Sequence, residues 1–403
     1  MKYLLILADG MADEALTDLG NRTPLQYAQT PNMDFLAQTA YIGTAQTIPA
    51  GFPPGSDVAN LSVLGYNPEL YYTGRSPLEA VSMGVAMSDN DLALRCNLVT
   101  LSAAAVYEDR VMADYSAGEI TSEESRQLIA LLQSELGNAE LSFHAGISYR
   151  HLLLWKGGAE RKMNLTPPHD ISGRVVGEYL PQGQDSAMLL DIMKKSLDLL
   201  ENHPINERRR SQGKNPAVSA WFWGQGKKPA LDSFAVKYGL QGSVVAAVDL
   251  VKGLGICAGL RPVLVPGATG AIETNFAGKA RAALDELLGG QDFVYMHIES
   301  PDEAGHQGNL KAKLWSIEQI DKEVVGLVRS ELHRFDDLRV MIIPDHPTPL
   351  SIKTHSNGMV PYLIFDKNHP AHSGVGQYHE EAAKHGRHFP AGHEVMDYFI
   401  RGE

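Results

Sequence analysis

The feature that most constrains the fold is an apolar run at residues 340–343, which is followed after one proline by Asp345 and His346. Four apolar residues without a polar break predict a strand that is buried on both faces, as in a parallel sheet. Open α/β sheets bind their ligands beyond the carboxyl ends of such strands. An aspartate that merely begins a turn is the alternative, so the pair gains weight only if other strands end in similar side chains.

Two further apolar runs end in the same way. Residues 3–7 stop at Asp9, and residues 293–298 are followed by Asp302 and His306. Because Asp302 and His306 are four positions apart, they share one face if this segment is helical. Each residue taken alone has a purely structural alternative, as a helix cap, a turn residue or a chance acid on a helix. We nevertheless expect the three strand ends to meet at one edge of a sheet.

A serine in a constrained loop is the next candidate. The segment Gly51-Phe52-Pro53-Pro54-Gly55 forces a loop, and residues 56–64 can continue as a helix. Ser56 at this junction is either an ordinary helix cap or the acceptor of a phosphoryl group, because free backbone N–H groups at a helix start bind phosphate. A metal ion that lowered the pKa of this serine would make it a nucleophile.

The chain thus offers six oxygen or nitrogen ligands, namely Asp9, Asp302, His306, Asp345, His346 and His355. Any one of them is more often structural, but the whole set in this order is not expected by chance. Mixed carboxylate and imidazole ligands suit zinc, manganese or iron better than calcium or magnesium. Six ligands and a shared serine suffice for two ions, an arrangement that stabilises the attacking and leaving oxygens in phosphoryl transfer.

The order of predicted elements indicates two domains in an α/β protein. We expect a mostly parallel sheet sandwiched by helices in residues 1–87 and 227–403, because apolar strands and helices alternate there. Residues 88–226 mix strands and helices differently and are expected to form an inserted α+β domain. Within it, the polar stretch 203–216 is expected to be a solvated loop.

Composition limits the partners and the compartment. The net charge of −13 argues against nucleic acid or an anionic membrane as a partner, since both favour basic faces. Two cysteines, Cys96 and Cys257, make no disulfide framework and fit a reducing cytosol, so a cytoplasmic location is expected. The first apolar run is too short for a signal peptide, and no apolar run is long enough to cross a membrane.

Several longer motifs occur together over essentially the whole chain: Ala8-Asp9-Gly10, Pro54-Gly55-Ser56-Asp57-Val58-Ala59-Asn60-Leu61-Ser62, Gly74-Arg75-Ser76-Pro77-Leu78-Glu79-Ala80, Arg95-Cys96-Asn97, Asp114-Tyr115-Ser116-Ala117-Gly118, Tyr149-Arg150-His151, Ala247-Val248-Asp249-Leu250-Val251-Lys252-Gly253, Asp302 with Gly305-His306, and Asp345-His346 with His355-Ser356. With them the chain resembles the cofactor-independent (2,3-bisphosphoglycerate-independent) phosphoglycerate mutases of archaeal type, a branch of the alkaline phosphatase superfamily.

The resemblance implies an alkaline-phosphatase-like fold and a set of roles. Ser56 would be the phosphorylated nucleophile, held with Asp9, Asp345 and His346 by one metal ion, and Asp302, His306 and His355 would hold a second. The ions would be Mn²⁺ or Zn²⁺, with Co²⁺ as a further candidate. Lys252 would neutralise the transferring phosphate. The inserted domain would supply guanidinium forks for the glycerate carboxylate, and the candidates are Arg95, Arg150, Arg75 and Arg110.

The implied activity is the interconversion of 3-phosphoglycerate and 2-phosphoglycerate without bisphosphoglycerate, in glycolysis and gluconeogenesis. The partner would be a small phosphorylated substrate, with the chain acting as a monomer or homo-oligomer. A phosphoserine that must survive reorientation of glycerate needs water excluded, so the inserted domain is expected to close like a lid.

Two departures from the bacterial form of these mutases keep alternatives open. Asn60 stands where that form has a histidine, as it does throughout the archaeal-type branch, and Gly224-Gln225-Gly226-Lys227-Lys228 stands where it has Arg-Ala-Asp-Arg. The second departure leaves the substrate open. The alternatives are a homoserine kinase-like phosphotransferase for threonine synthesis, a phosphomonoesterase of the same superfamily, and a metal-stabilised binding protein without turnover.

Overall fold

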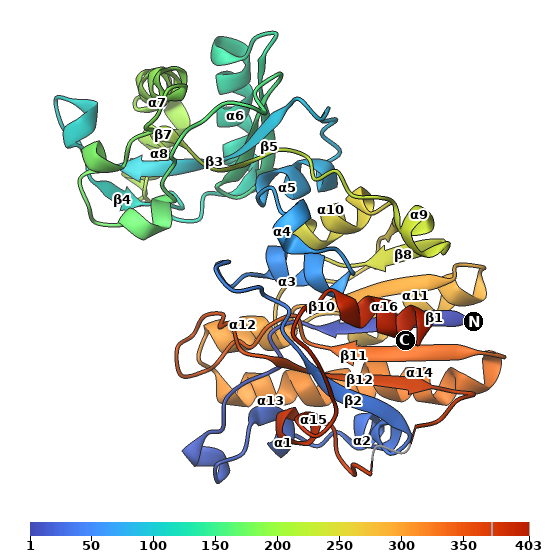
Figure 1. The fold of residues 1–403 in the computed structure, drawn as a ribbon. Helices are drawn as coiled ribbons and strands as arrows, with labels where there is room; N and C mark the ends of the chain where they lie inside the picture. Colours follow the sequence, from blue (N-terminus) through green and yellow to red (C-terminus); the bar gives the residue numbers. More distant parts are fainter. Residues whose placement is uncertain (372–373, 403) are drawn as a thin grey trace. The chain divides into compact units, whose positions relative to one another are not determined.

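The computed structural model describes residues 1–371 and 374–402, and the chain divides into two compact units. The first unit joins Met1–Tyr72 to Leu231–Glu403, and the second unit is the continuous segment Thr73–Ala230 (Figure 1). The second unit is therefore inserted into the first. No helix of the described residues has the length and apolar character needed to cross a membrane.

The boundaries of the inserted unit lie outside those expected at residues 88 and 226. Helix α5 (Ser76–Ser82) packs on strands β3 (Leu92–Leu101) and β7 (Ser219–Gly226) of the second unit, so it belongs to that unit. The sequence pattern placed the boundary after this helix because its apolar positions do not show which sheet they cover.

The first unit is built on a sheet that has eight strands in the described residues, in the order β13-β2-β12-β11-β1-β10-β8-β9 (Figure 1). Neighbouring strands are parallel except in the β11–β12 and β12–β2 pairs, as the expected mostly parallel sheet requires. The strands are β1 (Lys2–Ala8), β2 (Ala40–Ala45), β8 (Gly242–Val245), β9 (Arg261–Val263), β10 (Phe293–Ile298), β11 (Leu338–Ile343), β12 (Val360–Asp366) and β13 (Arg387–Phe389).

The three apolar runs that ended in candidate ligands form the adjacent strands β11, β1 and β10. Leu7 of β1 pairs with His297 on one side and with Ile343 on the other. Because all three strands run in the same direction, the segments that follow them leave the sheet at one edge. This arrangement confirms the expected meeting of the strand ends.

The antiparallel strands bring one more segment to this edge. Ala45, the last residue of β2, pairs with Val360, the first residue of β12. Since β12 runs against β11, the connection from Ile343 to Val360 lies at the carboxyl end of β11. The segment after Ala45 starts beside it and leads to Ser56. The topology therefore brings the segments that follow β1, β2, β10 and β11 to one edge of the sheet.

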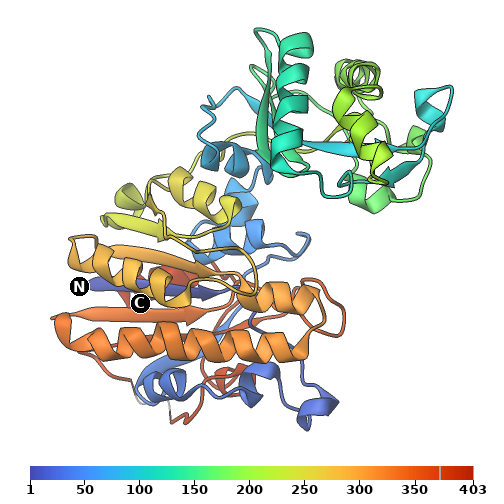
Figure 2. The same ribbon diagram turned by 180° about the vertical axis from the view of Figure 1, so that it is seen from behind.

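Helices cover both faces of this sheet. The α-helices of this unit are α1 (Pro24–Tyr27), α2 (Pro31–Ala37), α3 (Ser56–Val63), α4 (Pro68–Tyr71), α9 (Phe234–Tyr238), α10 (Asp249–Cys257), α11 (Phe276–Leu288), α12 (Ser300–His306), α13 (Leu310–Gln319), α14 (Gly326–Glu331), α15 (Glu380–Ala383) and α16 (Glu394–Arg401). Figure 2 shows α11, α13 and α14 lying across one face. On the other face, Phe399 of α16 packs edge-on against Tyr3, with ring centroids 5.5 Å apart.

The second unit is an α+β structure, as expected. Its antiparallel sheet has the order β4-β3-β6-β5, and β7 pairs with β3 as well. Helices α6 and α7 pack on β5 and β7. Besides the elements named above, the unit contains β4 (Met112–Asp114), β5 (Leu141–Ile147), β6 (Arg150–Trp155), α6 (Ser122–Leu136), α7 (Ser186–Leu200) and α8 (Pro204–Ser211).

The expectation of a solvated loop at 203–216 is wrong, because α8 lies there. His203 caps the helix by accepting a hydrogen bond from the backbone N–H of Ile205, and a proline occupies the first turn. Arg209 is only 2% exposed and makes an ion pair of 2.7 Å with Glu124. A run of three arginines looks like a solvated surface in sequence, but one of them is buried in the interior of this unit.

Candidate active site

The residues that follow β1 and β11 form one group of side chains at the sheet edge. Nε2 of His346 lies 3.7 Å from Oδ1 of Asp9 and 3.3 Å from Oδ2 of Asp345. Oγ of Ser56 lies 3.2 Å from the same Nε2 atom. All four side chains are buried. The structure therefore brings together the residues that were expected to share one metal ion.

A second group forms around Asp302. Its Oδ2 atom lies 3.2 Å from Nε2 of His306, and its Oδ1 atom lies 3.4 Å from Nε2 of His355. The residues 300–306 are helical, so the spacing of four does place Asp302 and His306 on one face. The rings of His346 and His355 lie 4.0 Å apart, which makes the two groups contiguous.

Ser56 is the first residue of α3, and Gly55 is the cap residue of this helix. The interpretation of Ser56 as an ordinary cap is therefore wrong. Its hydroxyl faces His346, and the side chain is 8% exposed. The loop with two prolines and two glycines ends where the helix begins, so a short rigid turn delivers the serine to the ligand group.

Close packing after strand β1 explains why a glycine occupies position 10. Gly10 has a φ of 61°, and a Cβ there would lie 2.7 Å from Cα of Asp302 and 2.6 Å from Oγ1 of Thr348. Its backbone N–H donates to Oδ1 of Asp345 at 3.2 Å. Only glycine fits both this backbone conformation and this contact, so Gly10 lets the strand ends of β1 and β11 approach.

The sequence analysis missed several residues that hold the ligands. Nδ2 of Asn60 donates to Oδ2 of Asp345 at 2.8 Å, and Oγ1 of Thr348 donates to Oδ1 of Asp302 at 2.6 Å. His297 lies 2.8 Å from Oδ2 of Asp9 through its Nε2 atom. Thr348 stands two positions after His346, and His297 is the penultimate residue of β10. Their positions near the candidate ligands were a signal that the sequence analysis could have used.

Burial and mutual contact set the charges of the second group. Burial disfavours the charged form of Asp302, but hydrogen bonds from His306 and His355 outweigh it and hold the pKa of the carboxyl well below its usual range. The same contact with Asp302 raises the pKa of His306 to about 9. Asp302 is therefore an anion at neutral pH, ready to act as a ligand.

Burial and the neighbouring carboxylates shift the pKa values of the first group toward the neutral forms. Burial, followed by the nearby Asp345 carboxylate, raises the pKa of Asp9 well above its usual value. Burial also lowers the pKa of His346, which keeps its imidazole neutral. Oδ1 of Asp9 is buried and has no hydrogen-bond partner in the described chain.

These residues fit divalent metal ions. The donor atoms of Asp9, Asp345 and His346 lie within 4.8 Å of one another, and so do those of Asp302, His346 and His355. Nε2 of His306 lies 2.9 Å from Nε2 of His355, so both imidazoles direct a nitrogen toward the same point beside Asp302. The buried, unpartnered oxygen of Asp9 gains a partner if an ion binds, so the donor set and the burial both favour metal binding.

Lys252 is on α10, which contacts α3, the helix that begins at Ser56. Its ammonium makes an ion pair of 2.9 Å with Asp249 one turn earlier. Among the described residues, no hydrogen bond or ion pair within 4.0 Å joins Lys252 to the ligand groups. Its expected contact with a transferring phosphate stays a prediction.

The four arginines belong to the second unit and differ in their contacts. Arg95 pairs with Glu79 and lies over the ring of Trp223 at 4.6 Å, and Arg75 pairs with the same glutamate at 3.4 Å. Because β6 pairs Arg150 with Asn97, two residues after Arg95, Arg95 and Arg150 emerge on the same face of the sheet.

Arg110 is engaged inside the second unit. It is 7% exposed, pairs with Glu201 at 2.8 Å and donates to the carbonyl groups of Ser102 and Ala104, both at 3.3 Å. These contacts fix the loop after β3. Of the four candidates, Arg95 and Arg150 share a face, whereas Arg110 is held by the protein itself.

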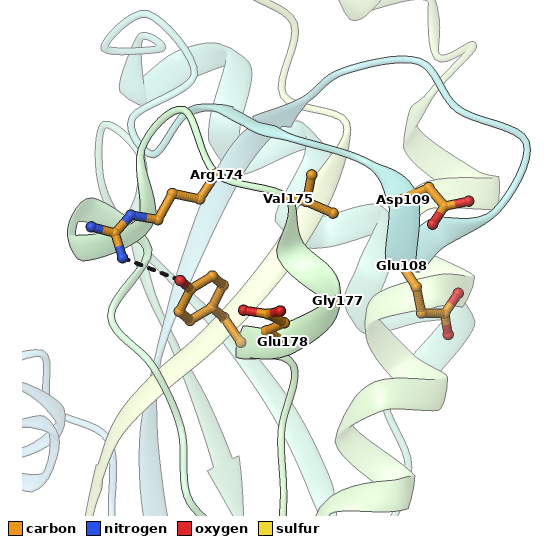
Figure 3. Close-up of a pocket in the computed structure, with 7 residues that line it drawn as sticks. Glu108, Asp109, Arg174, Val175, Gly177 and Glu178 are labelled. Carbon is orange, nitrogen blue, oxygen red and sulfur yellow. Dashed lines mark hydrogen bonds between the residues drawn. The ribbon is translucent and has the colours of Figure 1, made fainter.

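A separate cavity of about 480 Å³ lies in the second unit between Glu108, Asp109, Glu178 and the Arg174–Tyr179 pair (Figure 3). Nη1 of Arg174 donates to the Tyr179 hydroxyl at 3.1 Å. Three carboxylates against one guanidinium give the lining a negative balance, which does not suit a phosphorylated substrate. None of the residues expected for the active site lines this cavity.

Comparison with known proteins supports a single family. A profile of the family described as 2,3-bisphosphoglycerate-independent phosphoglycerate mutase matches residues 37–206. The chain is 50% identical to a probable 2,3-bisphosphoglycerate-independent phosphoglycerate mutase of Geobacter sulfurreducens, over 95% of each chain. It is 49% identical to the 2,3-bisphosphoglycerate-independent phosphoglycerate mutase of Methanosarcina barkeri, over 96% of each.

Solved structures agree. A protein from Pyrococcus horikoshii superposes with a TM-score of 0.82 at 31% identity, over 99% of this chain and 96% of that one. A cofactor-independent phosphoglycerate mutase from Thermoplasma acidophilum superposes with a TM-score of 0.69 at 26% identity, over 100% and 99%. Since identity of about one half extends along nearly the whole chain and both structures share its fold, the chain belongs to the 2,3-bisphosphoglycerate-independent phosphoglycerate mutase family.

Proposed function

We propose that this protein interconverts 3-phosphoglycerate and 2-phosphoglycerate through a phosphorylated Ser56, without bisphosphoglycerate. The observation that carries the proposal is the position of Ser56 at the start of α3, with Oγ 3.2 Å from Nε2 of His346, among the candidate metal ligands. The names of the relatives support this reaction and do not favour the homoserine kinase alternative. The substrate is then a small phosphorylated acid.

Two ions are the proposed cofactors, and Mn²⁺, Zn²⁺ or Co²⁺ would suit the mixed ligands. Asp9, Asp345, His346 and Ser56 would hold one, and Asp302, His306 and His355 the other. When bound, such ions supply Lewis-acid stabilisation of the phosphoryl oxygens and lower the pKa of the serine hydroxyl. The low cysteine content, with Cys96 and Cys257 alone, fits a reducing compartment, and we propose the cytoplasm as the location.

The protein's own groups have distinct tasks in this proposal. Ser56 Oγ forms a bond to phosphorus as the substrate oxygen leaves, and the reverse step returns the phosphoryl group to the other hydroxyl of glycerate. The N-terminus of α3 favours the negative charge that collects there. Lys252, on a helix that contacts α3, is the proposed cation for the phosphate in transfer.

Arg95 and Arg150 are the proposed groups for the glycerate carboxylate, because a guanidinium binds a carboxylate through two parallel hydrogen bonds. Trp223 and Glu79 hold Arg95 in place, whereas Arg150 is exposed, with its guanidinium 5.5 Å from the ring of Tyr149. Replacement of Arg150 by methionine is expected to raise the KM for phosphoglycerate. The exposed Arg126 on α6 is a matched control, and Arg126→Met is expected to leave KM unchanged.

The deciding experiment measures conversion of 3-phosphoglycerate to 2-phosphoglycerate by Mn²⁺-loaded protein without added bisphosphoglycerate. Ser56→Ala is expected to abolish conversion. Ser62→Ala is the matched control, because Ser62 is equally buried on the same helix and its hydroxyl has no hydrogen-bond partner in the described chain. Removal of metal with a chelator is expected to stop the reaction, and added Mn²⁺ to restore it.

Other products would redirect the assignment. Release of free phosphate without isomerisation would indicate a phosphomonoesterase that uses the same serine. Formation of phosphohomoserine from homoserine and ATP would indicate the kinase. If Ser56→Ala changed neither metal content nor any reaction of phosphorylated compounds, the site would be a binding site without turnover.

A further inference from the structure

The carboxylate of Asp57 lies beside the proposed nucleophile, Ser56, which is the preceding residue. Its Oδ1 atom accepts a hydrogen bond of 3.0 Å from the backbone N–H of Val58. The same atom lies so close to Gly55 that a Cβ on this glycine would be 2.7 Å from it. Ser56 and Asp57 are only 8% and 9% exposed. One carboxylate oxygen therefore lies against the backbone on both sides of Ser56.

The other oxygen of this carboxylate is held by Tyr72. The Tyr72 hydroxyl donates a hydrogen bond of 2.6 Å to Oδ2 of Asp57. This length is in the range of charge-assisted hydrogen bonds, which are about twice as strong as bonds between neutral groups. Asp57 therefore links Tyr72 to the first turn of α3.

Tyr72 also contacts the loop that precedes Ser56. Its ring packs edge-on against the ring of Phe52, with centroids 6.0 Å apart. Phe52 is half-buried, whereas residues 51, 53 and 54 beside it are exposed. Both rings pack against a small buried cluster, which consists of Ile48, Val58 and Ala59. Tyr72 thus holds the chain four residues before the serine and one residue after it.

Tyr72 is also the last residue of the first unit before the inserted segment. The next residue, Thr73, belongs to the second unit, and its hydroxyl donates to the backbone carbonyl of Lys227, directly after β7. Two adjacent residues are therefore fixed to different units. The chain that connects the units begins at the residue that holds the Ser56 loop.

We propose that Tyr72 is a positioning residue for Ser56, and that it acts through its hydrogen bond to Asp57 and its packing against Phe52. The hydroxyl keeps the start of α3 in one orientation relative to the candidate metal ligands. A nucleophile that is misplaced by about 1 Å can lose about 100-fold in rate, because the reacting atoms must be aligned. The inference rests on the proposed role of Ser56 as the nucleophile.

The test is Tyr72→Phe, which removes the hydroxyl and keeps the ring that packs against Phe52. In Mn²⁺-loaded protein we expect kcat for isomerisation to fall about 10-fold with little change in KM, because the hydroxyl is not among the groups proposed to bind the substrate. Tyr3→Phe is the matched control, since it removes a hydroxyl of the same unit that donates to the carbonyl of Ile400 at 3.0 Å. The control should leave kcat and KM unchanged.

A second readout does not depend on catalysis. Amide hydrogen exchange, measured by mass spectrometry, should become faster in the peptide that covers residues 50–60 of Tyr72→Phe and stay the same in other peptides. Asp57→Asn removes one of the two carboxylate oxygens, so it should cause the same local change. Adding Tyr72→Phe to Asp57→Asn should then cause no further loss of kcat, because the same hydrogen bond is already lost. If Tyr72→Phe does not fold, as judged by circular dichroism, Asp57→Asn replaces it with the same expected changes.

Other results decide against the proposal. An unchanged kcat in Tyr72→Phe would overturn it, as would a rise in KM that accounts for the whole loss of activity. Faster exchange throughout the chain would also overturn it, because Tyr72 would then contribute only to general stability. If the wild type formed no 2-phosphoglycerate, the mutase assignment would fail, but the exchange of residues 50–60 would still decide the role of Tyr72. Faster exchange there would support positioning, and unchanged exchange would exclude it.

Discussion

The Tyr295 hydroxyl donates a hydrogen bond of 2.7 Å to Oδ1 of Asn60, and this contact fixes the orientation of the Asn60 amide. Nδ2 of Asn60 then faces the backbone carbonyl of Ser56 at 2.9 Å and Oδ2 of Asp345 at 2.8 Å. One amide therefore links the start of α3 to the end of β11. Asn60 therefore positions both the segment of Ser56, the proposed nucleophile, and the carboxylate of Asp345, a proposed metal ligand.

Tyr295→Phe tests this link. The variant removes one hydroxyl and leaves Oδ1 of Asn60 buried without a donor, so we expect a loss of about 1–3 kcal/mol in the free energy of unfolding. We also expect a lower kcat with little change in KM, because Asp345 and the Ser56 segment lose a fixed neighbour. Urea unfolding and the isomerase assay check both effects, and unchanged kcat would show that Asn60 holds its orientation without Tyr295. Tyr107→Phe, which removes a buried hydroxyl bonded to Ser219 in the second unit, is the control for kcat.

Thr348→Val tests the support of the second ligand group. Valine keeps the shape of threonine but removes the hydroxyl that donates to Oδ1 of Asp302 at 2.6 Å. Loss of such a contact to a metal ligand is expected to weaken Mn²⁺ binding by about 10- to 100-fold. Thr348→Ser keeps the hydroxyl and should bind like the wild type. Calorimetric titration of chelator-treated protein measures the difference, and equal affinities for valine and serine would show that Asp302 needs no such donor.

Lys313→Met tests a buried ion pair that contacts the backbone of Thr348. Nζ of Lys313 lies 2.6 Å from Oδ2 of Asp13 and donates to the carbonyl of Thr348 at 2.8 Å, and neither charged side chain is exposed. Removing the ammonium leaves a buried carboxylate unpaired, which is expected to cost about 3–5 kcal/mol of unfolding free energy. The double variant with Asp13→Leu should recover much of this loss, because no unpaired charge remains. Chemical denaturation measures the unfolding free energy of both variants. If the double variant recovers none of the loss, the loss comes from packing and not from the unpaired carboxylate.

His151 predicts a pH dependence in the second unit. Its imidazole is 4% exposed and accepts from the backbone N–H of Gly146 at 3.1 Å, and burial lowers its pKa to about 3. The unfolded chain takes up a proton below about pH 6.5, whereas the folded chain stays neutral until about pH 3. Stability is therefore lost as the pH falls through this window, by up to about 1.4 kcal/mol per pH unit.

The measurement compares urea unfolding at about pH 7 and about pH 4.5 in the wild type and in His151→Gln, which keeps an acceptor for Gly146 but cannot take up a proton. The wild type should lose more stability between the two conditions than the variant. An equal loss in both proteins would assign the acid sensitivity to other groups.

The sequence by itself determined the central strands and which candidate ligand side chains follow them. The runs before Asp9, Asp302 and Asp345 have no polar break, and such runs are stable only inside a covered parallel sheet, so their carboxyl ends had to meet. The spacing of Asp302 and His306 likewise fixed their common face once the segment was helical. These inferences succeed because strand burial and helix periodicity are local properties of the chain.

Only the tertiary structure decided what surrounds those ligands. Tyr295 and His297 read as strand residues, and nothing local shows that one orients Asn60 while the other faces Asp9. The sequence also did not predict the burial of Arg209 in α8, the position of α5 in the second unit or the contacts of Arg110. Each of these features depends on a partner that is far away in the sequence. Residue type and spacing specify which groups can bind a metal ion, but the packing of distant segments decides which groups hold them in place.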